Sequence, residues 1–88
     1  MKKIKFSGRE LATLQAIDFG NGALGSEIID KTRIIEEELC EVINGLMAAG
    51  FVETNPPAES VASEAFCGTL FEVNPGYVQE IKLATRRS

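Results

Sequence analysis

The sequence predicts a mostly helical fold with one small antiparallel β-hairpin, in a single domain over residues 1–88. Apolar residues recur at helical spacing before Gly50, and two short extended segments follow, over residues 51–54 and 68–73. A further helix start lies at Asn74. With 88 residues, 44% of them hydrophobic and 25% charged, the chain can build one core but not two domains of ordinary size.

Two helices are predicted in the first part of the chain. The first covers roughly residues 8–19, because Ser7 and Glu10 have the spacing of a capping box and the Gly-Asn-Gly run at 20–22 stops the helix. The second runs from about Ser26 to Thr32, and its isoleucines form the buried side.

The third helix, over residues 36–49, has the clearest pattern. Its apolar stripe comprises Ile35, Leu39, Val42, Ile43 and Leu46. The opposite side comprises Glu37, Glu41, Asn44 and Ala48, with Cys40 beside this exposed face. Gly50 suits a left-handed C-terminal cap, so we expect a Schellman motif in which Phe51 folds back on Leu46.

A hairpin and a final helix complete the predicted fold. The extended segments 51–54 and 68–73 are expected to pair as its two strands, with a loop of about a dozen residues between them. Asn74 can then cap a last helix that runs from Pro75 to about Thr85. The predicted core comprises Leu11, Leu14, Ile17, Ile28, Ile34, Leu39, Val42, Ile43, Leu46, Phe51, Leu70, Phe71 and Ile81.

Three helices, a two-stranded wing and a C-terminal helix are the element order of the winged helix-turn-helix fold. The run from Ser26 to Glu53 resembles the second helix, turn and recognition helix of the MarR and PadR types of transcription regulator. In those families glycine usually occupies the turn where this chain has Arg33, and serine or threonine usually caps the recognition helix where it has Ile35. The resemblance implies a DNA-binding transcriptional regulator that uses helix 36–49 and the wing.

The distribution of charge argues against that function. The chain has 13 acidic and nine basic residues, and residues 27–64 alone carry a net charge of −7, from nine acids against Lys31 and Arg33. The predicted wing, residues 52–73, contains no lysine or arginine. Because neutralising phosphate supplies most of the affinity for nucleic acid, both contact elements carry the wrong sign for DNA.

We therefore expect a non-catalytic module that binds a basic protein surface, with duplex DNA as the alternative partner. The predicted interaction face comprises Glu37, Cys40, Glu41, Asn44 and Ala48. Glu37 and Glu41 stand four residues apart on one helix face, a repulsive spacing that a cationic partner would relieve. A purely structural interpretation stays open for the run Glu36 to Glu38, because carboxylates in a first turn stabilise the helix dipole by about 0.3–1 kcal/mol each.

No enzyme is predicted, and we expect no cofactor and no metal site. The chain has no histidine, which excludes His-based triads and Cys/His zinc sites. The Gly-x-Gly-x-x-Gly spacing at 20–25 matches a dinucleotide-binding motif, but no strand precedes it, so we interpret it as a flexible turn. Cys40 and Cys67 are interpreted as small, partly buried apolar residues that form no disulfide with each other, with a redox-sensing thiol as the open alternative.

The remaining expectations concern location and assembly. The longest apolar run, residues 46–52, is too short for a membrane span, and two cysteines in an otherwise ordinary composition fit a reducing compartment. We expect a cytoplasmic protein that is a monomer or a small homodimer. A basic patch would form only if the two termini meet, bringing Lys2, Lys3 and Lys5 to Lys82, Arg86 and Arg87.

Overall fold

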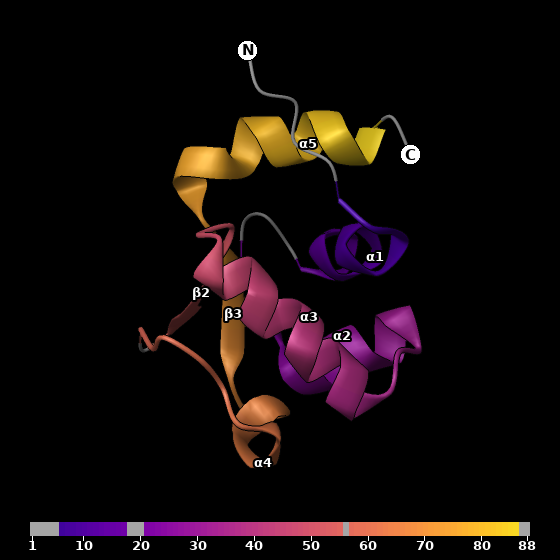
Figure 1. Ribbon diagram of the computed structural model, residues 1–88, viewed down its shortest axis with the longest axis vertical. Coiled ribbons are helices and arrows are strands. Elements are labelled where there is room, and N and C mark those ends of the chain that lie inside the picture. The colour runs from indigo at the N-terminus through magenta and orange to yellow at the C-terminus, as the bar shows by residue number, and fades with distance from the viewer. Residues whose placement is uncertain (1–5, 18–20, 56, 87–88) are drawn as a thin grey trace.

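The computed structural model describes residues 6–17, 21–55 and 57–86, the last three of them by their backbone alone. It confirms the mostly helical class (Figure 1). The elements in chain order are α1 (Gly8–Ala16), β1 (Ala23–Leu24), α2 (Gly25–Thr32), α3 (Glu36–Ala48), β2 (Val52–Asn55), α4 (Ser63–Phe66), β3 (Leu70–Val73), a 3₁₀ turn η1 (Pro75–Tyr77) and α5 (Val78–Arg86). Figure 1 shows α5 and α4 at opposite ends of the molecule, with α1, α2 and α3 between them beside the sheet.

The sheet has three antiparallel strands in the order β1-β3-β2. The predicted hairpin pairing is confirmed, because Val52 lies opposite Val73 and Thr54 opposite Phe71. The expected strand count of two is wrong, since Ala23 and Leu24 add a strand to the free edge of β3. Two residues are too few to show the alternation that identifies a strand in a sequence.

The Gly-x-Gly-x-x-Gly segment is therefore not the flexible turn that we predicted. It contains β1, and the amide of Gly25 donates a hydrogen bond to the Thr69 carbonyl at 3.1 Å. A β-carbon on Gly25 would lie 2.0 Å from the Phe66 carbonyl oxygen, so the glycine allows two backbones to pack closely. Gly20 lies outside the described residues.

The loop predicted between the hairpin strands contains a short helix, α4. Its last residue, Phe66, is fully buried, and its ring centroid lies 5.2 Å from that of Phe71. The predicted loop of about a dozen residues did not include this helix. A single aromatic residue inside a polar segment gives no periodic signal, although its burial anchors the whole connection to the core.

The core lies between the sheet and the first three helices, and Ile81 of α5 closes it at one end. The predicted core residues that are buried are Leu14, Ile17, Ile28, Leu39, Ile43, Leu46, Phe71 and Ile81. The others are only half-buried, namely Leu11, Ile34, Val42, Phe51 and Leu70. Buried residues that the sequence pattern missed are Thr13, Ala16, Ala23, Cys40, Val52, Thr54, Val61, Phe66 and Val73.

The predicted helix caps are present. Ser7 accepts from the Glu10 amide at 3.2 Å while the Glu10 carboxylate accepts from the Ser7 amide at 2.7 Å, which completes the capping box. At the end of α3, the Phe51 amide donates to the Leu46 carbonyl at 2.9 Å, and Gly50 has a φ of 89°. This is the expected Schellman motif. Helix α1 ends at Ala16, before the predicted end, and residues 18–20 lie outside the described part of the chain.

Asn74 connects the end of α3 with the start of the last helical segment. Its side-chain amide donates to the Gly50 carbonyl at 2.7 Å, and its side-chain oxygen accepts from the Gly76 amide at 3.0 Å. The predicted cap at Asn74 is thus confirmed. The predicted helix from Pro75 to about Thr85 begins instead as a 3₁₀ turn and continues as α5.

Candidate functional site

The predicted interaction face on α3 is only partly exposed. Glu37, Glu41 and Ala48 are exposed to solvent. Asn44 is half-buried, and Cys40 is 8% exposed. The expectation that Cys40 lies beside an exposed face was therefore wrong, because the segment between β2 and α4 folds back over this part of α3.

The backbone amide and carbonyl of Val61 attach the segment between β2 and α4 to helix α3. Asn44 accepts from the Val61 amide at 2.8 Å and donates to the Val61 carbonyl at 3.0 Å. The Cys40 thiol donates to the same carbonyl at 3.2 Å. Both polar atoms of the Asn44 side chain and the Cys40 thiol thus form hydrogen bonds within the protein.

Several carboxylates surround the covered thiol. Burial raises the pKa of Cys40 above the ordinary thiol value of 9.0, and the negative charges of Glu36, Glu41 and Glu64 raise it further, while the hydrogen bond from Asn44 lowers it. Glu64 comes from α4 and lies far from α3 in the sequence. We use the name acidic surface for Glu37 and Glu41 of α3 together with Glu64 of α4.

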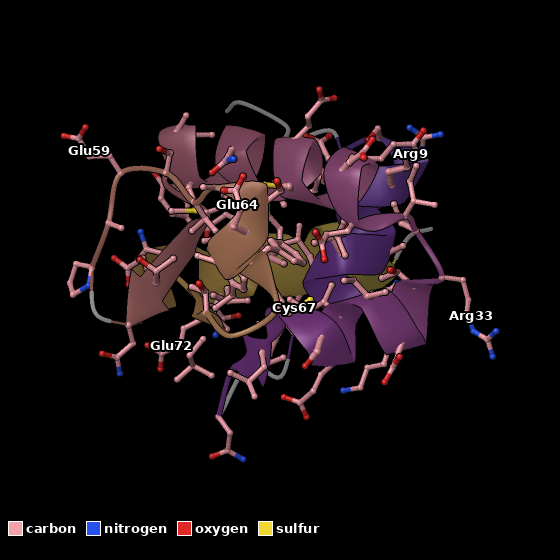
Figure 2. All side chains as sticks on the ribbon, turned by 90° about the horizontal axis from the view of Figure 1, so that it is seen from below. Arg9, Arg33, Glu59, Glu64, Cys67 and Glu72 are labelled. Carbon is pink, nitrogen blue, oxygen red and sulfur yellow. The ribbon has the colours of Figure 1, made fainter. Side chains whose placement is uncertain are left out.

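The second cysteine lies at the border of this acidic surface. Cys67 is exposed after α4 (Figure 2). Its thiol donates to the Glu36 carboxylate at 3.2 Å. This hydrogen bond to a carboxylate raises the pKa of Cys67, because it stabilises the protonated thiol. The raised pKa of each thiol favours its protonated form over the thiolate, which is the nucleophilic form.

The sequence around these carboxylates contains few basic residues. The sequence has no lysine or arginine from residue 34 to residue 81, a stretch with nine glutamates. Figure 2 shows Arg9 and Arg33 on the opposite side of the molecule from Glu59 and Glu72. Arg9 forms a salt bridge of 3.3 Å with Glu38, which is exposed and therefore weak. The expected basic patch depends largely on Lys2, Lys3, Lys5 and Arg87, which lie outside the described residues.

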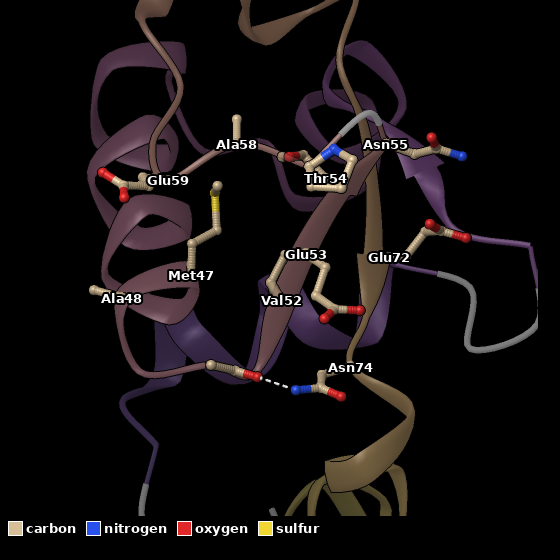
Figure 3. A pocket seen from close by; sticks show the side chains of 12 residues that line it. Met47, Ala48, Val52, Glu53, Thr54, Asn55, Ala58, Glu59, Glu72 and Asn74 are labelled. Atoms are coloured by element: carbon tan, nitrogen blue, oxygen red, sulfur yellow. Dashed lines mark hydrogen bonds between the residues drawn. The ribbon is translucent and has the colours of Figure 1, made fainter.

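A groove of about 580 Å³ runs between the C-terminal part of α3 and strand β2 (Figure 3). Its apolar lining includes Met47, Val52, Pro57 and Ala58, and its acidic lining includes Glu53, Glu59 and Glu72. The segment after β2 spans one end, and the hydrogen bond from Asn74 to Gly50 marks the other. Sequence reasoning missed this groove, and its available signal was the set of four glutamates in the predicted wing, three of which line the groove.

The exposed side chains of the acidic surface and of the groove are mainly carboxylates, which accept hydrogen bonds and attract cations. Within residues 6–17, 21–55 and 57–86, no group of three or more Cys, Asp or Glu side chains is arranged to hold a metal ion. Among the helices of that part of the chain, none combines the length and apolar character needed to cross a membrane.

The chain matches no protein-family model, no curated protein and no solved structure.

Proposed function

We propose that this chain is a non-catalytic module of the winged-helix type, which binds a basic protein surface through its acidic surface. In this proposal α2 and α3 are the helix-turn-helix, and β2, β3 and the segment between them are the wing. The relation to the MarR and PadR regulators is part of the proposal, and it rests on the resemblance of residues 26–53.

The observation that carries the proposal is the chemistry of the exposed side of α3. This side presents Glu37 and Glu41, and the amide of Asn44, its one neutral donor side chain, is engaged by Val61. A helix that reads a DNA groove needs donors for the base acceptors and cations for the phosphates. The described part of α3 supplies carboxylates instead, and these complement lysine and arginine side chains.

Repulsion within the acidic surface favours the same kind of partner. Glu37 and Glu41 are one helical turn apart, and like charges at this spacing destabilise a helix by about 0.2–0.5 kcal/mol. Glu64 adds a third negative charge from α4. A basic partner would remove this repulsion, and the gain would fall as salt screens the charges over about 10 Å at 0.1 M ionic strength.

The test is a pair of titrations of the full chain, one with a fluorescent lysine-rich peptide and one with mixed-sequence duplex DNA. The double variant Glu37→Gln, Glu41→Gln should bind the peptide more weakly than the unmodified protein. The double variant Asp30→Asn, Glu80→Gln is the matched control, because it removes the same charge from exposed positions of α2 and α5. It should bind the peptide as the unmodified protein does.

Reversing the charge of α3 tests the alternative partner. Glu37→Lys combined with Glu41→Lys changes the helix by +4 in charge and should raise nonspecific affinity for duplex DNA. Sequence-preferring binding of the unmodified protein to DNA at physiological salt, in the ~10⁻⁸ to 10⁻¹¹ M range of specific complexes, would contradict the proposal if chemical-shift changes map it to α3.

A further inference from the structure

We propose that the groove between α3 and β2 is a second contact site, which takes up one lysine or arginine side chain from an extended segment of a basic partner. The inference rests on the proposed function in one respect, that the partner is basic. The site itself is separate from the acidic surface, because it is formed by the end of α3, strand β2 and the segment at 57–59.

The walls of the groove suit the aliphatic stem of such a side chain. Met47 of α3 is half-buried and lines the groove, whereas the side chain of Val52 is 2% exposed and belongs to the core beneath it. Pro57 and Ala58 also line the groove, from the segment after β2, and both are exposed. Lysine and arginine bury their methylene groups along apolar surface and keep the charged end in water, so a groove that is open to solvent fits both parts.

The polar lining of the groove suits the charged end. Glu53 and Glu72 lie directly opposite each other on β2 and β3, so their side chains share one face of the sheet. Glu59 lines the groove from the segment above. Across the described residues, no salt bridge joins any of these three carboxylates to a lysine or arginine. A bound cation would supply the missing partner.

Because Glu53 lies directly opposite Glu72, a binding role of Glu53 can be distinguished from a purely structural one. Like charges opposite each other destabilise a strand pair. The variant Glu53→Gln should therefore raise the melting temperature of the free protein while it lowers affinity for a basic peptide. A glutamate that served only to stabilise the sheet would give the opposite change in melting temperature.

The experiment follows the methyl signal of Met47 while the full chain is titrated with a lysine-containing peptide. The protein has two methionines, Met1 and Met47, so ¹³C-methyl labelling gives two signals, one of which reports on the groove. A second peptide has norleucine in place of lysine, which keeps the stem and removes the charge. We expect a saturable shift of Met47 with the lysine peptide and no shift with the norleucine peptide.

Two further variants separate the groove from general electrostatic attraction. Ala58→Phe places a bulky side chain at a lining position without changing charge and should lower affinity for the lysine peptide by about five- to tenfold. Ser60→Phe, two residues further along the same exposed segment, should not lower it. The double variant Glu53→Gln, Glu72→Gln should abolish the Met47 shift.

The outcomes distinguish this inference from the proposed function. If the peptide binds but Met47 does not shift, or if Ala58→Phe binds as the unmodified protein does, the groove is not a site. The proposed function then survives provided that Glu37→Gln with Glu41→Gln weakens binding. If only the groove variants weaken binding, the groove is supported as a contact site and the proposed binding role of the acidic surface is wrong. No binding of the peptide overturns both.

Discussion

The side chain of Asn44 binds both backbone groups of Val61, which lies 17 residues later in the chain. Its oxygen accepts from the Val61 amide at 2.8 Å and its nitrogen donates to the Val61 carbonyl at 3.0 Å. An asparagine side chain thus satisfies a backbone unit as a neighbouring strand would. The pairing holds the segment between β2 and α4 against α3, and it places Val61 over Cys40.

Replacing Asn44 with alanine should detach this segment. The free energy of unfolding should fall by about 1–3 kcal/mol, because the two hydrogen bonds to Val61, of about 0.5–1.5 kcal/mol each, are lost together with the weaker one to the Cys40 sulfur. Chemical denaturation measures the change, and hydrogen exchange should be faster at the Val61 amide. Asn55→Ala, at an exposed position of β2, is the control and should change stability little. An unchanged exchange rate at Val61 would contradict this account of the segment.

Two glycines should respond to alanine in opposite directions. A β-carbon on Gly25 would meet the Phe66 carbonyl oxygen at 2.0 Å, so Gly25→Ala should destabilise the protein by about 3 kcal/mol or more. A β-carbon on Gly45 of α3 would meet no atom within 4 Å, so Gly45→Ala should stabilise it by about 0.5–1 kcal/mol. Denaturation midpoints of the two variants measure both effects. Equal changes would show that α2 and α4 are not packed this closely.

Arg33 ends α2 in the left-handed conformation, with φ 61° and ψ 16°. This conformation costs a residue with a β-carbon about 1–2 kcal/mol, and glycine avoids the cost. Arg33→Gly should therefore stabilise the protein, by up to about 1 kcal/mol after the larger entropy loss of glycine is subtracted. Arg33→Ala removes the same charge but keeps the β-carbon, so it is the control. A thermal melt in which both variants gain equally would attribute the effect to charge instead.

The thiol of Cys67 should become more reactive when Glu36 is neutralised. The Glu36 carboxylate accepts a hydrogen bond from this thiol and raises its pKa, which disfavours the reactive thiolate. Glu36→Gln should therefore speed alkylation of Cys67 by iodoacetamide at fixed pH, measured by mass spectrometry. Glu37→Gln is the matched control from the same helical turn. Equal rates in the two variants would show that the contact does not govern reactivity.

Cys40 should make the stability of the protein fall in alkaline solution. Because burial raises its pKa in the folded state, the thiol stays protonated there while the unfolded chain ionises above about pH 9.0. The unfolded state then binds fewer protons, so the stabilisation is complete below that pH and is lost as pH rises towards the folded pKa. Cys40→Ala should show a shallower decline in unfolding free energy between neutral and alkaline pH. Parallel declines would exclude this contribution.

Much of the local structure could be predicted from the sequence, because short-range interactions determine it. The capping box at Ser7 and Glu10 spans three residues, and the Schellman motif at Gly50 closes within five. Helix α3 follows from an apolar stripe with helical spacing, and β2 and β3 follow from two short extended segments. The residues that form each cap are close in the sequence, and the helix and the two strands each follow from a pattern within one short segment.

The accessible surface of α3 was decided by the tertiary structure alone. Helical periodicity assigns Cys40 and Asn44 to the same side as Glu41, but it carries no information about a segment that returns after 17 or more residues. The burial of Phe66 and the addition of β1 to β3 depend on similar long-range contacts. The sequence by itself therefore determined the negative charge of this side of the molecule. Which side chains remain open to a partner was set by loop closure and core packing, because exposure depends on every segment that folds against a residue.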